Sequence, residues 1–248
     1  MSGHALKNQS ALVTGASGGI GQAIARALAR AGAAVALHYR GGRAEAETLA
    51  REIEEAGGRA VAIAADLRKA EDIEALYDRA EEALGTLDIV INNAGVGTTG
   101  NLVETGTDEL DKLIDVNFRA VALSLRQAGR RVREGGVVIN ISSMLGDRPL
   151  PGTTTYAATK AAVNLLSRGA AREFAERGIS VKALSPGATV PGMFGESPQE
   201  RQDAFAGETP LGRIGSAADI ADTVVFLASA PGRWINGAMV TADGGYSA

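Results

Sequence analysis

Short apolar runs alternate with amphipathic stretches along nearly the whole chain. Most of these runs are continuous Val, Ile and Ala without polar alternation, which is typical of parallel strands covered on both faces. Between the runs, apolar residues recur at spacings of three and four, which predicts helices that bury one face. The predicted strands are Ala11–Thr14, Val35–Tyr39, Ala60–Ala64, Ile89–Ile91, Val137–Ile141, Ile179–Leu184 and Ala238–Thr241.

Repeated strand–helix units predict an α/β fold with a doubly wound parallel sheet, right-handed crossovers and helices on both faces. No linker rich in Pro or Ser divides the chain, so we expect its 248 residues to form one domain. The longest stretch without a periodic pattern, about residues 186–215, is rich in Gly and Pro. In such a fold, a stretch of this kind is a candidate lid over the binding site.

The amino-acid composition excludes several kinds of catalytic and metal-binding site. The chain is 45% hydrophobic and 22% charged, as expected of a globular protein. It has no Cys, which excludes disulfides, thiolate metal sites and Cys nucleophiles. Its two histidines are His4 and His38, so we expect neither a zinc site nor a Ser-His-Asp triad. Any acid–base chemistry must then come from Tyr, Lys, Ser or carboxylates, with no metal.

The charge balance and the hydropathy narrow the partners. Acidic residues outnumber basic ones by 29 to 25, which argues against a nucleic-acid partner. No apolar stretch reaches the roughly 18 residues that a membrane helix needs. The segment Met1–Ser10 lacks the apolar core of a signal peptide. We therefore expect a cytoplasmic protein with no membrane partner.

A glycine-rich turn, Thr14–Gly21, follows the first predicted strand and precedes a helix. A β-carbon would block both the tight turn and the approach of a pyrophosphate, and the helix N-terminus offers free N–H groups to that anion. A turn without a ligand would use the same glycines, but the place of this one in a βαβ unit favours a dinucleotide site. The predicted cofactor-binding residues of the turn are Gly15, Ala16, Ser17, Gly18, Gly19, Ile20 and Gly21.

The end of the second predicted strand separates NAD from NADP in dinucleotide-binding folds. An acidic residue there binds the ribose 2′-OH, whereas an Arg accommodates a 2′-phosphate. In this chain the strand is followed by Arg40, and no carboxylate occurs before Glu45. The planar guanidinium of Arg40 suits a phosphate, although a solvated Arg on a loop is the alternative. We expect NADP(H) to be preferred over NAD(H).

Four polar residues make a candidate catalytic set without histidine. Tyr156 and Lys160 are four apart in a helical segment, which puts them on one face. A free phenol has a pKa near 10, and an adjacent ammonium lowers it toward the range of a general acid–base, although such pairs also occur by chance on helix surfaces. Ser143 lies just past a predicted strand, at the edge where open α/β sheets bind ligands. Asn117 falls on the apolar stripe of its helix, as either a site residue or a buried Asn bonded to backbone.

Together these features resemble the short-chain dehydrogenase/reductase family, in its single-domain form. The resemblance implies a Rossmann fold of three α/β/α layers, with seven strands ordered 3-2-1-4-5-6-7. It also implies a homotetramer, in which the helices around residues 108–126 and 155–177 form one interface and the C-terminal segment a second. The matching motifs are Thr14–Gly21, Asp66, Asn92–Gly95, Asn117, Ser143, Tyr156 with Lys160, Pro186-Gly187 and Asp243-Gly244-Gly245.

The resemblance also implies roles for individual residues. Tyr156 would be the acid–base, Ser143 would orient the carbonyl, and Lys160 would bind the nicotinamide ribose and tune Tyr156. Asn117 would hold a water in the proton relay. Cofactor contacts are implied for Asp66 and Asn93 along the adenosine half, with Leu67, Ala94 and Gly95 beside them, and for Pro186 and Gly187 at the nicotinamide.

One position departs from the family pattern. The family often has a Thr four residues after the Gly of the Pro-Gly pair, where it bonds the carboxamide of the cofactor. Here that position is Pro191, which has neither a hydroxyl nor an N–H. We expect Thr189 to replace it through its side chain or backbone.

The spacing of Tyr156 and Lys160 bears on the substrate. Enoyl reductases of the family usually space this pair by seven, so a spacing of four favours a C=O substrate over C=C. The overall resemblance to 3-oxoacyl-[acyl-carrier-protein] reductases makes a 3-oxoacyl thioester the leading substrate, with sugar, steroid and small-ketone or alcohol chemistry left open. A dinucleotide-binding regulatory protein without catalysis is the alternative from another class, and an altered Tyr156, Lys160 or Ser143 would be its mark.

A basic stretch of the chain suggests a partner. Arg177 matches a position that those reductases use to dock an acyl carrier protein, and neighbouring arginines extend the patch. A solvated helix face would have the same composition. The additional residues are Arg130, Arg131 and Arg133.

Overall fold

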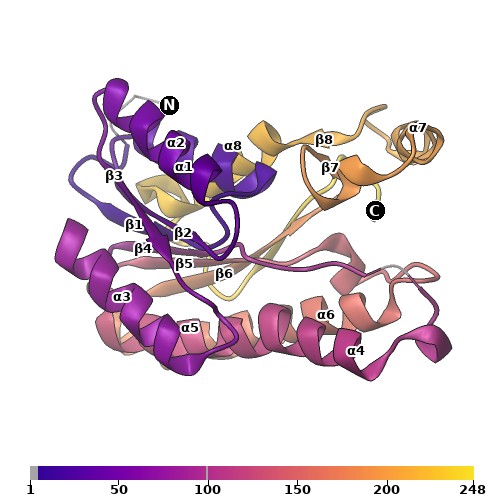
Figure 1. Cartoon of the computed structure of the whole chain (residues 1–248), viewed down its shortest axis with the longest axis horizontal. Helices are drawn as coiled ribbons and strands as arrows, with labels where there is room; N and C mark the ends of the chain where they lie inside the picture. Colours follow the sequence, from indigo (N-terminus) through magenta and orange to yellow (C-terminus); the bar gives the residue numbers. More distant parts are fainter. Residues whose placement is uncertain (1–4, 99) are drawn as a thin grey trace.

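The computed structural model describes residues 5–98 and 100–248, so His4 and Thr99 lie outside it. Seven parallel strands form one sheet in the order β3-β2-β1-β4-β5-β6-β9 (Figure 1). This is the order that the sequence predicts, with β9 as the seventh strand of the sheet. The strands are β1 Ser10–Val13, β2 Ala34–Tyr39, β3 Ala60–Ala64, β4 Ile89–Asn92, β5 Val137–Ile141, β6 Ser180–Pro186 and β9 Met239–Ala242.

Helices cover both faces of the sheet, which explains why the strands lack polar alternation. On one face lie α1 (Gly19–Arg30), α2 (Arg43–Glu55) and α8 (Ala217–Ala228), above the sheet in Figure 1. On the other lie α3 (Ala70–Leu84), α5 (Ala120–Arg131) and α6 (Thr154–Glu173). Each face has its own apolar core, with Ile24 and Val224 in the first and Leu76 and Val163 in the second.

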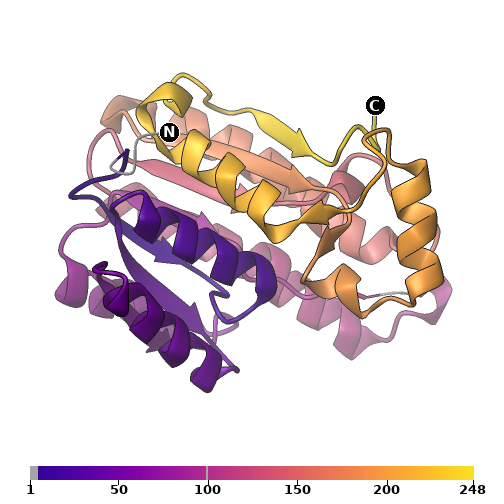
Figure 2. The same cartoon turned by 90° about the horizontal axis from the view of Figure 1, so that it is seen from above.

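The segment predicted as irregular, residues 186–215, contains more regular structure than expected. It includes β7 (Thr189–Val190), a short 3₁₀ helix (Met193–Glu196) and α7 (Gln199–Glu208). Strand β7 pairs with β8 (Gly215–Ser216) in a separate two-stranded sheet. Figure 2 shows this segment at the end of the molecule toward which the strands of the main sheet point. No residue of α7 is buried, so the helix has no apolar stripe from which it could be predicted.

A charged side chain of the central sheet lies inside the fold. Lys182 on β6 is fully buried, and its ammonium donates hydrogen bonds to Leu227 O at 2.8 Å and Ser180 Oγ at 3.0 Å. Burial lowers the pKa of Lys182 to about 8, because removing an ammonium from water disfavours its charged form. Its carbonyl partner belongs to the last turn of α8, so the lysine joins that helix end to the sheet.

Across the part of the chain that the structure describes, no helix combines the length and the apolar character that crossing a membrane requires.

Candidate active site

The turn between β1 and α1 is packed so closely that side chains are excluded. A β-carbon on Gly21 would lie 2.2 Å from Gly15 O, and one on Gly19 would lie 2.5 Å from Pro191 O. Gly15 itself has a φ of +66°, which only glycine adopts without strain. The turn delivers the chain to the N-terminus of α1 at Gly19, where unpaired N–H groups and the helix dipole favour an anion.

A cavity of about 300 Å³ opens over this turn. Its walls come from the turn itself and from the ends of β2, β3 and β4, so it crosses the middle of the sheet. Residues far apart in the sequence meet there because parallel strands end at one edge. The predicted cofactor residues that line it are Gly15, Ser17, Gly18, Gly19, Ile20, Gly21, Arg40, Asp66, Leu67, Asn93, Ala94 and Gly95.

Ala16 is the exception in the predicted turn. It is fully buried and is not part of the cavity wall. Its N–H donates to His38 O at 2.8 Å, so its backbone is used to hold the turn against β2. The turn places the neighbours of Ala16 in the cavity wall and this residue behind them, so a role of Ala16 in binding the cofactor stays a prediction.

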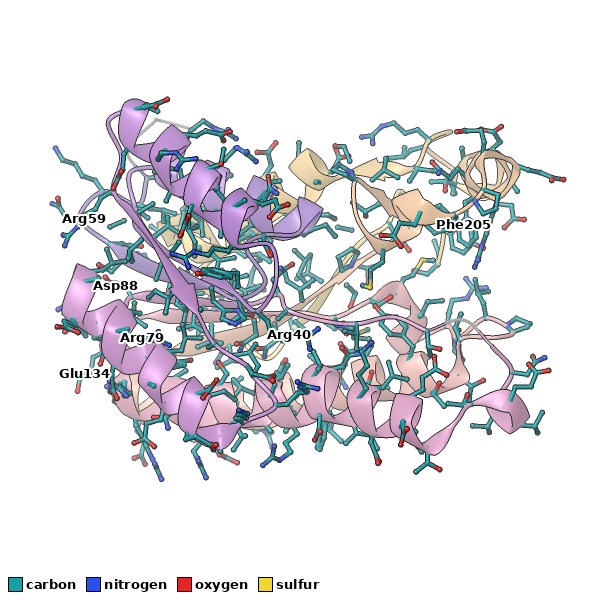
Figure 3. All side chains as sticks on the ribbon, viewed as in Figure 1. Arg40, Arg59, Arg79, Asp88, Glu134 and Phe205 are labelled. Carbon is teal, nitrogen blue, oxygen red and sulfur yellow. The ribbon has the colours of Figure 1, made fainter. Side chains whose placement is uncertain are left out.

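The ends of β2 and β3 carry the charges of the cavity. Arg40 is exposed and lines it, in the middle region of the view in Figure 3. Asp66 forms an ion pair with Arg68 at 2.5 Å, in which the Arg68 guanidinium donates hydrogen bonds to the carboxylate. These hydrogen bonds lower the pKa of the Asp66 carboxyl to about 2. Arg68 also lines the cavity, and sequence reasoning missed it because nothing in its pattern separates it from a solvated arginine.

A second cavity, of about 570 Å³, adjoins the first. The two share wall residues, among them Ile20, Asn93 and Gly95. Besides these three, six further predicted site residues line the second cavity, together with apolar side chains from β5, the loop after it and the segment 186–215. The six are Ser143, Tyr156, Lys160, Pro186, Gly187 and Thr189. The sequence-predicted Tyr, Lys and Ser therefore meet in one cavity beside the glycine turn.

Burial dominates the ionisation of Tyr156. It raises the pKa of the phenol to about 12, while the neighbouring Ser143 hydroxyl acts in the opposite direction. We expected Lys160 to lower this pKa, and the structure contradicts that for the chain alone. The Lys160 ammonium lies 5.7 Å from the centroid of the Tyr156 ring and donates to Ile141 O at 3.0 Å. Burial also lowers the pKa of Lys160 to about 8, which weakens the effect of its charge at alkaline pH.

Asn117 connects the end of β4 to α6. It lies in a π-helical turn, Asp115–Arg119, between α4 (Thr107–Ile114) and α5, a local irregularity that often marks functional sites. Its amide exchanges two hydrogen bonds of 2.8 Å with the backbone of Val96 and donates to Thr159 Oγ1 at 3.2 Å. Asn117 is fully buried and lies behind the walls of both cavities, so its side chain positions the site from outside them.

The C-terminal motif supports the Pro186-Gly187 loop. A β-carbon on Gly187 would lie 2.7 Å from the side chain of Asp243, so the two segments are in close contact. Asp243 accepts hydrogen bonds of 2.9 Å from Gly245 N and Ser247 N, which fixes the end of the chain there. Thr189, the expected replacement for the missing threonine, is buried and donates its hydroxyl to Gly187 O at 2.9 Å.

Three of the four arginines predicted to dock a carrier protein are engaged within the chain, and the fourth, Arg130, is exposed. Arg177 donates to two carbonyls at the end of α5, Gly129 O at 2.6 Å and Val132 O at 2.7 Å. Two others form ion pairs, Arg131 with Asp78 and Glu81, and Arg133 with Asp88. Two of the four arginines are thus paired with carboxylates, which the sequence did not reveal because the acidic partners lie on α3 and the loop after it.

Comparisons with known proteins agree with this geometry. The family model described as "Enoyl-(Acyl carrier protein) reductase" matches residues 15–247. The 3-oxoacyl-[acyl-carrier-protein] reductase FabG of Staphylococcus aureus is 38% identical over 239 residues, covering 96% of this chain and 97% of that protein. The chain belongs to the short-chain dehydrogenase/reductase family.

Solved structures of this family have the same fold. A short-chain dehydrogenase/reductase from Serratia marcescens superposes with a TM-score of 0.95 at 37% identity, over 99% of this chain and 100% of that one. A short chain dehydrogenase from Burkholderia cenocepacia, solved in complex with NADP, gives a TM-score of 0.93 at 39% identity, over 98% of this chain and 99% of that one. The chain is therefore an oxidoreductase of the short-chain dehydrogenase/reductase family with the Rossmann fold that its sequence predicts.

Proposed function

We propose that this oxidoreductase transfers hydride between NADP(H) and a carbonyl or secondary alcohol. The observation that carries the proposal is the junction of the two cavities. One is the glycine-lined cradle, in which a β-carbon at Gly19 or Gly21 would clash with neighbouring backbone, and the other contains Tyr156, Ser143 and Lys160. A dinucleotide in the first would place its reactive ring toward the second.

The residues that line the two cavities indicate which groups would hold the cofactor. The glycine turn would bind the pyrophosphate, Arg40 would bind the 2′-phosphate, and Asp66 would contact the adenosine end of the cofactor. The wall residues beside them that would also contact this half are Asn93, Ala94 and Gly95. Lys160 would bind the nicotinamide ribose, and Pro186, Gly187 and Thr189 would border the nicotinamide. When bound, the reduced cofactor supplies the hydride.

Side chains of the protein supply the proton that the carbonyl oxygen gains on reduction. In carbonyl reduction, the carbonyl carbon gains the hydride and the carbonyl oxygen takes the proton from the Tyr156 hydroxyl. Ser143 orients the carbonyl by donating a hydrogen bond to the same oxygen. Because burial raises the pKa of Tyr156 to about 12, the phenol carries its proton at neutral pH and is ready to act as the acid. This favours reduction over alcohol oxidation near neutrality.

A 3-oxoacyl thioester is the leading substrate. The relative FabG is named for such a reaction, and the cavity beside Tyr156 is lined by apolar side chains that suit an acyl chain, among them Met144, Leu145 and Leu150. The matching family model is described by enoyl reduction, but the Tyr156–Lys160 spacing of four favours a C=O substrate. The ion pairs of Arg131 and Arg133 leave less of the arginine patch open to an acidic partner, which favours small thioesters over delivery on an acyl carrier protein.

The test is NADPH oxidation with four substrates at equal concentration. They are a 3-oxoacyl thioester of N-acetylcysteamine, the same acyl group on a carrier protein, a simple ketone, and a trans-2-enoyl thioester. We expect turnover of the 3-oxo compounds, with little gain from the carrier protein and none with the enoyl thioester. Reduction of the enoyl thioester alone would refute the proposal, and binding of NADPH without turnover of any ketone would favour a regulatory protein.

The segment 186–215 supplies one wall of the substrate cavity, and we propose that it acts as a lid within a single domain. Met193, Phe194 and Phe205 line the cavity from this segment, and Figure 3 labels Phe205 on α7. Limited proteolysis tests the lid. Cleavage between residues 193 and 208 should slow when NADPH and substrate analogue are added, and unchanged cleavage would contradict it.

We also propose a homotetramer. Apolar side chains remain exposed along α4, the π-helical turn and α6, where Leu165 is 71% exposed. The others are Leu110, Ile114 and Phe118. Two isologous contacts, one of them on this face, would generate the tetramer. Light scattering at micromolar concentration should give four times the chain mass, and a monomer would refute the assignment.

A further inference from the structure

His38 lies directly beneath the cofactor turn, on the last but one residue of β2. Its side chain is 2% exposed, and it forms part of the wall of the first cavity. Its Nδ1 accepts a hydrogen bond from Gly15 N at 3.0 Å. Its Nε2 lies 3.2 Å from Ala65 O, at the end of β3, and its own carbonyl accepts from Ala16 N at 2.8 Å. One residue thus joins the turn to two neighbouring strands.

These bonds require one protonation state. The Gly15 N–H donates, so Nδ1 must present a lone pair, and the single ring proton must lie on Nε2, where it is donated to Ala65 O. The imidazole is therefore neutral in the assembled turn. Its surroundings maintain that state, because burial lowers the pKa of His38 to about 4.

We propose that His38 is a positioning residue of the cofactor site, whose neutral imidazole holds the glycine-rich turn in its binding conformation. The proposal rests on the function proposed above only in that the turn binds NADP(H). Gly15 has a left-handed φ of +66°, and its carbonyl lies against Gly21, so a shift at Gly15 moves the N-terminus of α1. The imidazole is the acceptor that the structure gives for the Gly15 N–H, so losing it leaves that donor unpaired.

The charges around His38 oppose its protonation. Arg79 on α3 reaches Ala64 O at 2.6 Å, beside the carbonyl that His38 uses, and Arg40 directly follows β2, two residues after His38. Both lower the pKa of His38. Asp66, after β3, acts in the opposite direction, but its carboxylate already pairs with Arg68. A second ring proton would also face the Gly15 N–H directly. Acid is therefore expected to release the turn.

Three substitutions separate the two hydrogen bonds of the ring. In His38→Asn the amide oxygen takes the place of Nδ1, so the acceptor for Gly15 is kept and the titrating group is lost. In His38→Gln the longer amide reaches toward Ala65 O instead, and in His38→Leu both bonds are lost. The readout is the dissociation constant of NADP⁺ at pH 7, measured by calorimetry on the full chain, with unfolding in urea measured in parallel.

We expect His38→Leu and His38→Gln to weaken NADP⁺ binding by about 5- to 150-fold, the range for an unpaired buried donor. His38→Asn should stay within about threefold of wild type, a difference below 1 kcal/mol. Equal affinity in wild type and His38→Leu would overturn the proposal, and so would equal weakening in the Leu and Asn variants, which would indicate a packing role only. Failure of the wild type itself to bind NADP⁺ would instead contradict the proposed function.

A pH series gives a readout that packing alone would not move. The ratio of dissociation constants, wild type over His38→Asn, should be constant from pH 8 to pH 5 and rise as the pH falls through about 4, the pKa of His38 in the folded chain. Taking the ratio removes the titration of the cofactor phosphate and of Asp66, which both proteins share. A ratio that stays constant through pH 4 and below, in samples that remain folded, would show that the His38 proton does not control the turn.

Discussion

Adding one methyl group at Gly21 tests how tightly the cofactor turn is built. A β-carbon there would lie 2.2 Å from Gly15 O, 2.9 Å from Gly15 C and 2.8 Å from Asn93 Nδ2. The first two atoms are backbone, so the clash cannot be relieved by turning a side chain. In Gly21→Ala the turn must move away from α1, and the N–H groups aimed at the pyrophosphate move with it.

The size of the effect follows from the cost of overpacking. Forcing an additional carbon into a closely packed site costs about 1–3 kcal/mol. For a chain of this length, each kcal/mol lowers the melting temperature by about 2–4 °C, so a fall of roughly 2–12 °C is expected. If binding requires the wild-type turn, the same energy appears as a loss of about 5- to 150-fold in NADPH affinity.

The assay is a fluorescence titration with NADPH, together with thermal unfolding of the same samples. Gly41→Ala is the matched control, because Gly41 lines the same cavity and a β-carbon there meets nothing within 4 Å. We expect the control to bind and unfold much like wild type. If Gly21→Ala binds NADPH with wild-type affinity, the glycine turn is not the cofactor site.

Three further predictions use charged and titrating groups. Arg40→Asp should weaken NADPH binding by about 10- to 150-fold and leave NADH binding equal or better, and a wild-type preference for NADH in titrations would refute this. Alcohol oxidation needs the Tyr156 phenolate, whose pKa is raised to about 12. The rate of alcohol oxidation should increase about tenfold per pH unit between pH 6 and pH 8, while the rate of ketone reduction stays constant. An oxidation rate that does not change with pH would contradict the assignment of Tyr156 as the acid–base. Lys182→Met removes a desolvated ammonium together with its two hydrogen bonds, two effects of similar size, so the free energy of unfolding at pH 7 should change by no more than about 2–3 kcal/mol. The pKa of Lys182 falls to about 8 in the fold, so wild-type stability rises with pH above 8 and the wild type should gain stability relative to the variant between pH 7 and pH 10, as urea unfolding at both would show; an unchanged difference would contradict this.

The layered fold is predictable from sequence because its signal is repeated. Seven apolar runs, each within two residues of the observed strand ends, alternate with amphipathic helices, and short crossovers leave few topologies. Most candidate site residues are predictable for the same reason, since each follows a strand end or stands in a glycine-rich turn. Helix α7 cannot be predicted in this way, because none of its residues is buried and it therefore has no apolar stripe.

Other properties depend on magnitudes that spacing cannot give. The i,i+4 spacing of Tyr156 and Lys160 is matched by their meeting in one cavity, but the spacing does not show that burial raises the pKa of Tyr156. Likewise, the sequence shows Arg177 and its neighbours as a basic cluster, whereas the fold supplies carbonyls and carboxylates to bind them. From the sequence, His38 contributes only to the argument against a zinc site or a Ser-His-Asp triad, because its hydrogen bond to Gly15 depends on β2 lying beside the turn.

Tyr156 as the proton donor is the central element of the proposed reaction. Tyr156→Phe keeps the ring that fills the buried site and removes only the hydroxyl, so NADPH binding should remain within about threefold of wild type. The decisive measurement is single-turnover hydride transfer from bound NADPH to a ketone that the wild type reduces well, followed by stopped-flow absorbance. Loss of general acid catalysis predicts a rate about 10²- to 10⁴-fold lower in the variant. A wild-type rate of hydride transfer in Tyr156→Phe would show that another group donates the proton.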